Sequence, residues 1–169
     1  MHVSAKADYA LRACVALAAV HPQRVSAAAL AESYDMPRKF LEAVLADLRR
    51  ASVVRSVRGA EGGYTLAREP EQIAAGEVLR AIDGPLSHVH GRDPHELSYP
   101  EDLSRIQELW LAARAAVRLV LDEVTLAELV DGEWPPSVAQ LLRSSDLWEP
   151  RTGPQKPRTQ RGGVVEWAI

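Results

Sequence analysis

The chain has 169 residues, of which 47% are hydrophobic and only 5% aromatic, with a formal net charge of -3 at pH 7. This length suits one domain with an extension, and the hydrophobic content is ample for a core. Because no apolar run approaches the ~20 residues of a membrane span and no leader pattern opens the chain, we expect a cytoplasmic protein without a membrane partner. The single cysteine, Cys14, excludes a disulfide framework and any all-cysteine zinc or iron–sulfur site within one chain.

The charge is divided unevenly along the chain. Residues 1–86 hold 11 Lys/Arg against 10 Asp/Glu, residues 87–150 hold 5 against 12, and residues 151–169 hold 4 against 1. A near-neutral segment binds a polyanion if its positive charges are clustered, whereas an acidic segment is a poor nucleic-acid surface. We therefore expect the first half to bind a partner and the remainder to have a different task.

The first predicted helix covers residues 5–20 and begins after a capping serine, Ser4. Cys14 falls on its apolar face, among alanines and leucines at three- and four-residue spacing. We expect Cys14 to pack in the core as a small hydrophobic residue rather than to act as a redox or metal-binding thiol.

Two short helices are predicted next, at residues 27–34 and 37–51. Ser26 precedes the first, and Pro37 occupies a position that the first helical turn tolerates. Short helices joined by a three-to-four-residue turn are typical of a helix-turn-helix, although αα-hairpins of other helical domains share the pattern. We expect the apolar residues of the second helix to face inward: Phe40, Leu41, Val44, Leu45 and Leu48.

Basic side chains mark both ends of this second helix. Arg38 and Lys39 lie in its first turn, where a recognition helix presents side chains to bases and phosphates and where cations oppose the helix dipole. Arg49 and Arg50 lie in the last turn, where cations suit the dipole, so these two also have a purely structural explanation. We predict that Arg38, Lys39 and Arg49 contact DNA.

A β-hairpin is predicted over residues 53–66, where two β-prone runs flank a glycine-containing tip. Alone, it would be an ordinary surface hairpin. After a basic-tipped helix-turn-helix, it predicts a winged helix-turn-helix: the second helix enters the major groove, Arg55 adds charge, and Arg58 reaches the minor groove. Three glycines at the tip would let the backbone approach the DNA closely: Gly59, Gly62 and Gly63.

Five segments, in order across residues 3–86, are similar to those of the Rrf-two (Rrf2) family of bacterial transcription regulators. They are Ser4–Ala13, Phe40–Glu42, Leu48–Ala51, Val57–Tyr64 and Ile82–Leu86. The resemblance implies a homodimeric winged-helix repressor or activator on a palindromic operator, and of the two we expect a repressor. In the iron–sulfur cluster regulator of this family a recognition-helix glutamate helps to read bases, and the matching residue is Glu42, although an exposed helix-favouring residue is the plainer explanation.

The chain departs from the family pattern where sensory members carry three cysteines to hold an iron–sulfur cluster. At that place it reads Ser87–Glu96, without a cysteine. The resemblance therefore implies the cluster-free branch, some of whose members respond to sulfur or cysteine status through a partner protein. We expect no cofactor.

Histidines collect in the same segment. His88, His90 and His95 stand two and five residues apart, and with Asp8, which matches a cluster ligand of some relatives, they are candidate metal ligands. A polar loop that merely collects histidines, or that lines a small-ligand pocket, is the competing interpretation and the one we prefer.

The longest predicted helix covers residues 100–124 and repeats apolar residues over about three heptads. Because a helix-turn-helix reads palindromes as a dimer, we predict dimerisation through this helix, although it could instead pack on its own domain. The predicted interface consists of Leu103, Ile106, Trp110, Ala113, Val117, Val120 and Val124. Short helices are expected at residues 126–130 and 138–142.

These predictions divide the chain into a DNA-binding domain (1–86), a loop that is the candidate sensory region (87–99), a dimerisation region (100–149) and a disordered tail (150–169). The fold class is mainly α with a small β-hairpin wing, extended by a long dimerisation helix.

We find no phosphate-binding loop, nucleophile elbow or paired-histidine zinc helix, so an enzyme is not expected. The expected partners are a double-stranded DNA operator, a second copy of the chain, and a small-molecule or protein effector that carries a redox or metabolic signal. A winged-helix protein-interaction module without DNA binding and a metal-responsive regulator remain alternatives.

Overall fold

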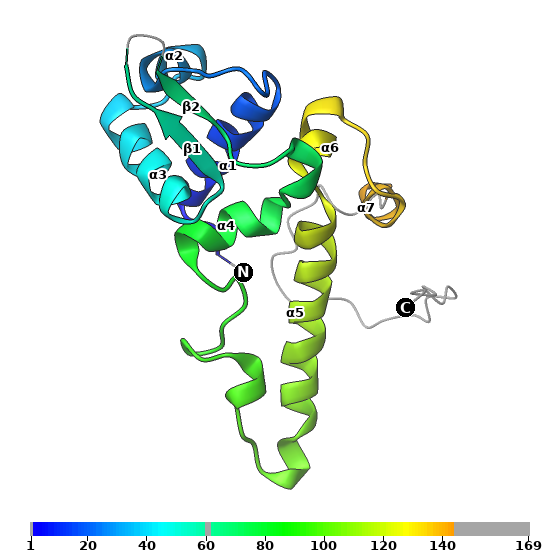
Figure 1. Cartoon of the computed structure of the whole chain (residues 1–169). Coiled ribbons are helices and arrows are strands. Elements are labelled where there is room, and N and C mark those ends of the chain that lie inside the picture. Colours follow the sequence, from blue (N-terminus) through cyan, green and yellow to red (C-terminus); the bar gives the residue numbers. More distant parts are fainter. Residues whose placement is uncertain (1, 60–61, 144–169) are drawn as a thin grey trace.

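The computed structural model describes residues 2–59 and 62–143. The predicted tail at 150–169 lies outside the described residues. The strands are β1 (Val54–Val57) and β2 (Gly63–Leu66); the helices are α1 (Ala5–Ala18), α2 (Ala27–Ser33), α3 (Arg38–Arg50), α4 (Ala75–Asp83), α5 (Arg105–Glu123), α6 (Leu126–Asp131) and α7 (Pro136–Leu142). Figure 1 shows a compact head built from α1–α4, the hairpin and α6, from which α5 extends as a long arm.

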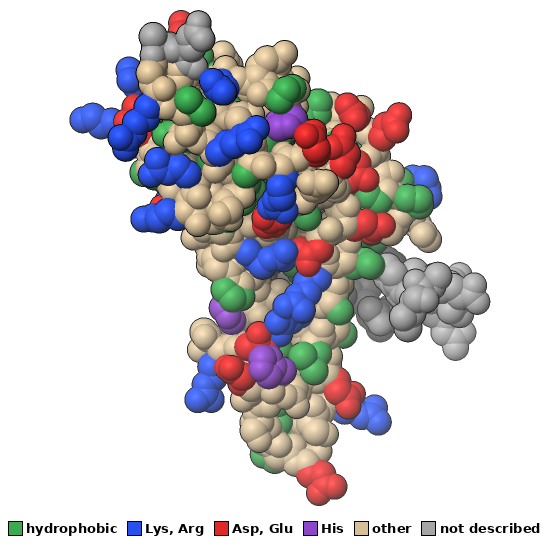
Figure 2. All heavy atoms as spheres, viewed as in Figure 1, with side chains coloured by type: hydrophobic (Ala, Val, Ile, Leu, Met, Phe, Trp, Pro, Cys, Tyr) green, Lys and Arg blue, Asp and Glu red, His purple; other side chains and the backbone are tan. Residues whose placement is uncertain are grey.

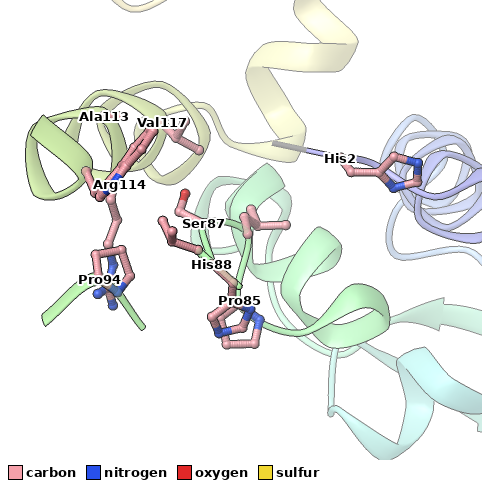
Figure 3. A pocket seen from close by; sticks show the side chains of 11 residues that line it. His2, Pro85, Ser87, His88, Pro94, Ala113, Arg114 and Val117 are labelled. Atoms are coloured by element: carbon pink, nitrogen blue, oxygen red, sulfur yellow. The ribbon is translucent and has the colours of Figure 1, made fainter. Parts of the chain in front are cut away.

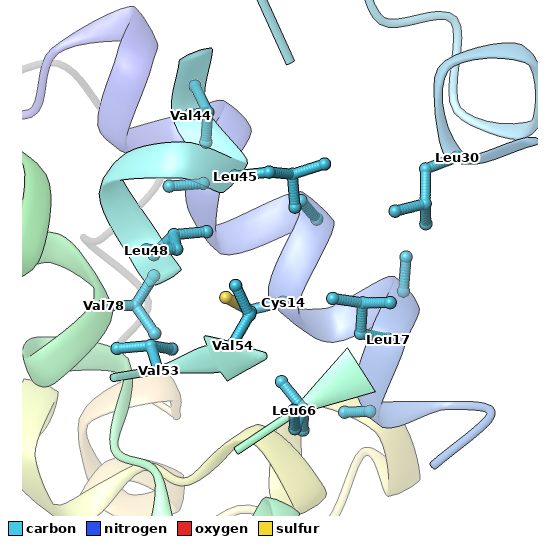
Figure 4. Close-up of a cluster of buried hydrophobic side chains, with 14 of the residues drawn as sticks. Cys14, Leu17, Leu30, Val44, Leu45, Leu48, Val53, Val54, Leu66 and Val78 are labelled. Atoms are coloured by element: carbon cyan, nitrogen blue, oxygen red, sulfur yellow. The ribbon is translucent and has the colours of Figure 1, made fainter. Parts of the chain in front are cut away.

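Helix α1 occupies the centre of the head. It begins where the Ser4 side chain accepts a hydrogen bond from the Ala7 backbone N–H at 3.1 Å, as predicted. Its alanines at positions 7, 10 and 13 are fully buried, and their small side chains let α3, α4 and α6 pack against it. The core assembled on this helix is drawn in Figure 4.

The prediction that Cys14 packs in the core is confirmed. Its side chain is fully buried among leucines and valines of α1, α3 and the hairpin. Burial, followed by the nearby charge of Glu77, raises the pKa of the Cys14 thiol, which therefore stays protonated at neutral pH. A protonated, inaccessible thiol has neither the nucleophilicity nor the exposure of a redox sensor.

Helices α2 and α3 form the predicted helix-turn-helix. Ser26 caps α2, and Asp35 takes a left-handed conformation (φ 48°) in the turn. Pro37 is extended and caps α3, so the helix begins at Arg38, one residue later than predicted.

The inward face of α3 differs from the prediction at one position. Four of its residues are completely buried: Leu41, Val44, Leu45 and Leu48. The prediction for Phe40 was wrong, because this ring remains 37% exposed and meets Tyr9 edge-on at 5.3 Å between ring centroids. Phe40 precedes Leu41 by one residue, which turns it about 100° away from the centre of the buried stripe.

The hairpin pairs β1 with β2 in antiparallel register, from Val54 opposite Leu66 to Val57 opposite Gly63. Val25, from the segment before α2, adds a third backbone pairing. Its N–H donates to the Tyr64 carbonyl at 2.9 Å, and its carbonyl accepts from the Tyr64 N–H at 2.8 Å. These two bonds fasten the hairpin to the helix-turn-helix.

The chain leaves the head after α4 and returns to it through α5 and α6. A short 3-10 turn at Glu101–Leu103 precedes α5, so the long helix begins at Arg105 rather than at residue 100. Leu126 of α6 is fully buried in the core of the head, and its N–H donates to the Ile73 carbonyl at 2.9 Å. The head is therefore completed by residues that follow the arm.

Helix α4 meets the arm at Gly76. A Cβ at this position would collide with the Asp122 carboxylate and lie 3.0 Å from the Leu121 carbonyl oxygen. Only glycine allows the two helices to approach so closely. No helix among the described residues combines the length and the apolar composition that crossing a membrane requires.

We expect Asp83→Asn to destabilise the head by about 0.5–1 kcal/mol at pH 7, as befits an exposed charge-assisted pair. The Ser4 hydroxyl and N–H donate to the Asp83 carboxylate at 2.5 and 2.9 Å, and these bonds lower the pKa of Asp83. Because the lowered pKa belongs to the folded state, the stabilisation is present above the ordinary aspartate pKa of about 3.9 and is lost as pH falls through the folded value. Thermal unfolding of both proteins should differ at pH 7, and the difference should shrink as pH falls below the ordinary aspartate pKa. An equal difference at pH 7 and in acid contradicts this assignment.

Candidate nucleic-acid interface

The N-terminal turn of α3 presents two cations to solvent. Arg38 and Lys39 are exposed, and Pro37 supplies no side-chain cap. Positive charge here opposes the helix dipole, so helix stability does not account for it. Figure 2 shows that Lys and Arg side chains gather over the end of the molecule that carries α3 and the hairpin, whereas Asp and Glu gather on the side of α6.

Arg38 and Glu42 form an ion pair one helical turn apart. The Arg38 Nε donates to Glu42 Oε1 at 3.0 Å, and both side chains are largely exposed. An exposed pair of this kind contributes at most about 1 kcal/mol, so a DNA phosphate or base can replace either partner at little cost. In the free protein, Glu42, the candidate for base readout, therefore also holds the side chain of Arg38.

The last turn of α3 is built differently. Arg50 and Lys6 both pair with Asp47, which explains Arg50 as a structural residue. Arg49 is exposed and reaches Ser56 of β1 at 3.4 Å, so it links the helix to the hairpin. Cations suit this end of the helix dipole, and Arg49 retains further N–H donors for a phosphate.

Arg55 and Arg58 stand on the outer side of the hairpin. Both are exposed, and neither has an ion-pair partner within residues 2–59 and 62–143. Gly59 follows Arg58 with φ +114°, and a Cβ built there would meet nothing within 4 Å. Among the described residues, nothing therefore fills the space beside Gly59, and its close approach to DNA stays a prediction.

The other two glycines of the tip have an internal role. A Cβ on Gly62 would collide with the Val57 carbonyl and lie 2.7 Å from the Gly59 carbonyl oxygen, both within the hairpin. A Cβ on Gly63 would lie 2.8 Å from the Val25 carbonyl oxygen. The fold of the free protein already favours glycine at both positions, so their presence has an internal explanation and close approach to DNA stays a prediction.

Arg24 was missed by the sequence interpretation. It is exposed and immediately precedes Val25, whose pairing with Tyr64 brings it beside the hairpin. No local pattern marks this contact, because it joins residues 39 positions apart. We define the basic face as Arg24, Arg38, Lys39, Arg49, Arg55 and Arg58.

The candidate metal ligands are not brought together. Asp8 pairs with Arg12 at 2.6 Å, and His95 Nδ1 lies 2.6 Å from Asp93 Oδ1. Across the part of the chain that the structure describes, no group of three His, Cys, Asp or Glu side chains is arranged to hold a metal ion.

One face of α5 lies against the chain's own segment 93–99. The Gln107 side chain donates to the Leu97 carbonyl at 2.7 Å, Trp110 Nε1 donates to the Tyr99 hydroxyl at 3.3 Å, and Arg114 pairs with Asp93. Val124, at the end of the predicted dimer seam, is buried inside the head. Another face is exposed and apolar, with four residues at heptad spacing: Leu109, Ala112, Ala116 and Leu119.

The model of the Rrf2 family, described as an iron-dependent transcriptional regulator, matches residues 3–132. The chain belongs to the Rrf2 family. This is a family of transcriptional regulators and not of enzymes, in agreement with the sequence prediction.

Two relatives illustrate the similarity. An HTH-type transcriptional regulator of Mycobacterium tuberculosis, Rv1287, is 44% identical over 142 residues, which cover 83% of this chain and 88% of the relative. The HTH-type regulator CymR of Bacillus subtilis is 37% identical over 137 residues, which cover 79% of this chain and 94% of CymR.

Solved structures confirm the winged helix-turn-helix. The structure of CymR, described as the global cysteine regulator of B. subtilis, superposes with a TM-score of 0.68 at 35% identity and covers 79% of this chain and 99% of CymR. That of IscR from T. potens gives 0.62 at 33% identity, over 79% of this chain and 89% of IscR.

Gly63→Ala should destabilise the protein by about 1–3 kcal/mol, because its methyl group must displace the Val25 backbone. Ser56→Ala, in the facing strand, changes only a weak hydrogen bond and should stay within about 0.5 kcal/mol of wild type. Urea unfolding measures both, and equal stabilities of the two variants would contradict the internal role of Gly63.

Proposed function

We propose that the protein is a sequence-specific transcriptional repressor that binds a palindromic operator as a homodimer. The observation that carries this proposal is the basic face, whose six cations are exposed and belong to α3, the hairpin and the segment paired with it. Figure 2 shows Lys and Arg side chains gathering over this end of the molecule. Family membership makes it an HTH-type transcriptional regulator; the dimer, the operator symmetry and repression are the proposed parts.

Each part of the basic face is assigned to a different part of the DNA. The N-terminal turn of α3 enters the major groove, where Arg38, Lys39 and Glu42 reach base edges and phosphates. The hairpin lies along the backbone beside it, and Arg58 enters the adjacent minor groove, whose negative potential attracts arginine. Arg24 and Arg55 flank the hairpin and contact phosphates.

Dimerisation through α5 would space two heads on one side of the DNA. A helix-turn-helix dimer needs its recognition helices about 34 Å apart, and a 19-residue helix provides an arm of suitable length. None of the residues of α5 is buried within the protomer, and Leu109 is 59% and Leu119 41% exposed. We place the centre of the interface on the exposed face of Leu109, Ala112, Ala116 and Leu119, bordered by Ala113 and Val120 of the sequence-predicted seam.

The proposed signal is metabolic and acts without a cysteine-ligated cluster, because the chain has only Cys14 and that residue is buried. The similarity to a regulator described as the global cysteine regulator makes a sulfur-containing metabolite the first candidate to test.

Lys39→Glu and Arg58→Glu should each weaken operator binding by about tenfold or more, because each places a negative charge against the DNA. Each should also reduce the magnitude of the slope of log affinity against log salt concentration by about one or more, because binding then releases at least one counterion fewer from the DNA. Fluorescence anisotropy with labelled operator DNA measures both quantities.

Arg105→Glu is the matched control, since Arg105 is an exposed arginine on the arm, outside the basic face. Wild-type affinity in both face variants, or an equal loss in the control, would indicate a winged-helix module that binds another protein rather than DNA.

Leu109→Glu combined with Leu119→Glu should convert the dimer to monomer, because two buried charges per chain would face their own copies across the two-fold axis. Leu111→Glu on another side of α5, where Leu111 is also exposed (38%), should leave the dimer intact. Sedimentation velocity distinguishes the species. A dimer that survives the double substitution, or a monomeric wild type, would contradict the proposed interface.

A further inference from the structure

A hollow of about 490 Å³ lies between α5 and the segment that follows α4. Pro85 and Ser87 form one side, and Ala113, Arg114 and Val117 of α5 form the other, as Figure 3 shows. This volume falls within the roughly 300–1,000 Å³ typical of small-molecule sites.

Positive charge converges beside this hollow. A second, smaller recess adjoins it and shares Ser87 and Arg114 with it. Arg80 from α4 and Arg118 from α5 also line that recess, together with the apolar residues Pro85, Leu86, Val117 and Leu121. Three arginines and one serine therefore contribute to the lining of this recess. Arg114 and Arg118 come from residues 87–150, where acidic residues outnumber basic ones by 12 to 5.

The arginines keep donors for a further ligand. Arg114 pairs with Asp93 and Arg80 pairs with Asp122, the latter at 2.6 Å, each recorded through one terminal nitrogen. Because a guanidinium carries five N–H donors, both can bind a second acceptor. Arg118 has no ion-pair partner within the described residues, so the three arginines exceed their two carboxylate partners by one positive charge.

Most of the remaining lining of the hollow is apolar, and two histidines, His2 and His88, complete it. Trp110, Val117 and Pro94 line it, and Pro94 is buried. A ligand with an anionic group at the arginines could rest a short carbon skeleton on these side chains, which is the usual division of such sites into an apolar wall and a few polar anchors.

We propose that this hollow binds a small organic anion, with its carboxylate or oxyanion group held by Arg114, Arg118 and Ser87. This inference rests on the proposed function, for which it supplies the effector site. Ser87 lies four residues after the last residue of α4, and α4 packs on α1, α3 and α5. Arg80 lines the adjoining recess and pairs with Asp122 of α5, so an anion bound here lies beside an ion pair that joins the head to the arm.

The test is isothermal titration calorimetry of the full-length protein with succinate, sulfate and phosphate, at ionic strength held constant with potassium chloride. At least one probe should bind saturably, with one site per chain. Saturation by succinate but neither inorganic ion identifies a carboxylate ligand, and the reverse identifies an oxyanion ligand. Absence of saturable heat with all three overturns the proposal.

Two variants locate the bound anion. Arg118→Gln should weaken binding by about tenfold, the loss of one charge-assisted hydrogen bond, and Ser87→Ala should weaken it less. Arg118 is exposed, so its replacement should not affect folding. Arg105→Gln, on another side of α5, is the control for general charge and should bind like wild type. Equal losses in Arg118→Gln and Arg105→Gln overturn the proposal.

Trp110 reports the position of the ligand independently. Tryptophan fluorescence should change on titration, and Trp110→Phe should abolish that change while calorimetry still detects binding. A change that persists in Trp110→Phe places the anion elsewhere and overturns the site. DNA binding is measured separately on the same samples. If the protein binds DNA but no anion, only the anion site is overturned. If it binds an anion but no DNA, only the proposed function is overturned.

Discussion

Close packing around α1 is the constraint on which the rest of the structure depends. Ala7, Ala10 and Ala13 are fully buried where α3, α4 and α6 cross this helix. Larger side chains at these positions would push apart the helix that carries the basic first turn, the helix that joins the arm, and the helix that returns from it. These three small side chains thus allow the close packing that positions α3 and α4 on α1.

The positive charges in the first turn of α3 oppose the helix dipole and attract a polyanionic partner. The first turn carries Arg38 and Lys39 without a side-chain cap, and Glu42 partly offsets the charge of Arg38. At the other end, Arg50 and Lys6 both pair with Asp47, whose single charge offsets one of the two cations. On the head, Lys39, Arg55 and Arg58 have no ion-pair partner among the described residues, and they belong to α3 and the hairpin. This separation of charge on one short helix is the physical basis of the proposed DNA contact.

Local chemistry made the secondary structure predictable. Ser4 and Ser26 each cap a helix as predicted, and the hairpin and both helix-turn-helix elements lie within a residue or two of their predicted bounds. The long arm was also predictable from its apolar period, because that period depends only on neighbouring residues.

Features that depend on contacts between residues far apart in the sequence could not be predicted. The pairing of Val25 with Tyr64 gives Gly63 an internal role and places Arg24 beside the hairpin, yet nothing near either residue signals the contact. Along α5, the period locates an apolar stripe but not which face the chain itself covers; segment 93–99 takes the face of Gln107 and Trp110 and leaves that of Leu109 and Leu119. The hollow beside Arg114 likewise joins α5 to residues far away in the sequence.

Selection of bound sequences from random double-stranded DNA by the purified protein tests the central claim most directly. The account predicts enrichment of an inverted repeat whose half-sites are about one helical turn or a multiple of it apart, with A·T-rich flanks where Arg58 would enter a narrow minor groove. Failure to enrich any sequence, or enrichment of a single half-site without symmetry, would contradict a dimeric winged-helix reader built on α3 and its hairpin.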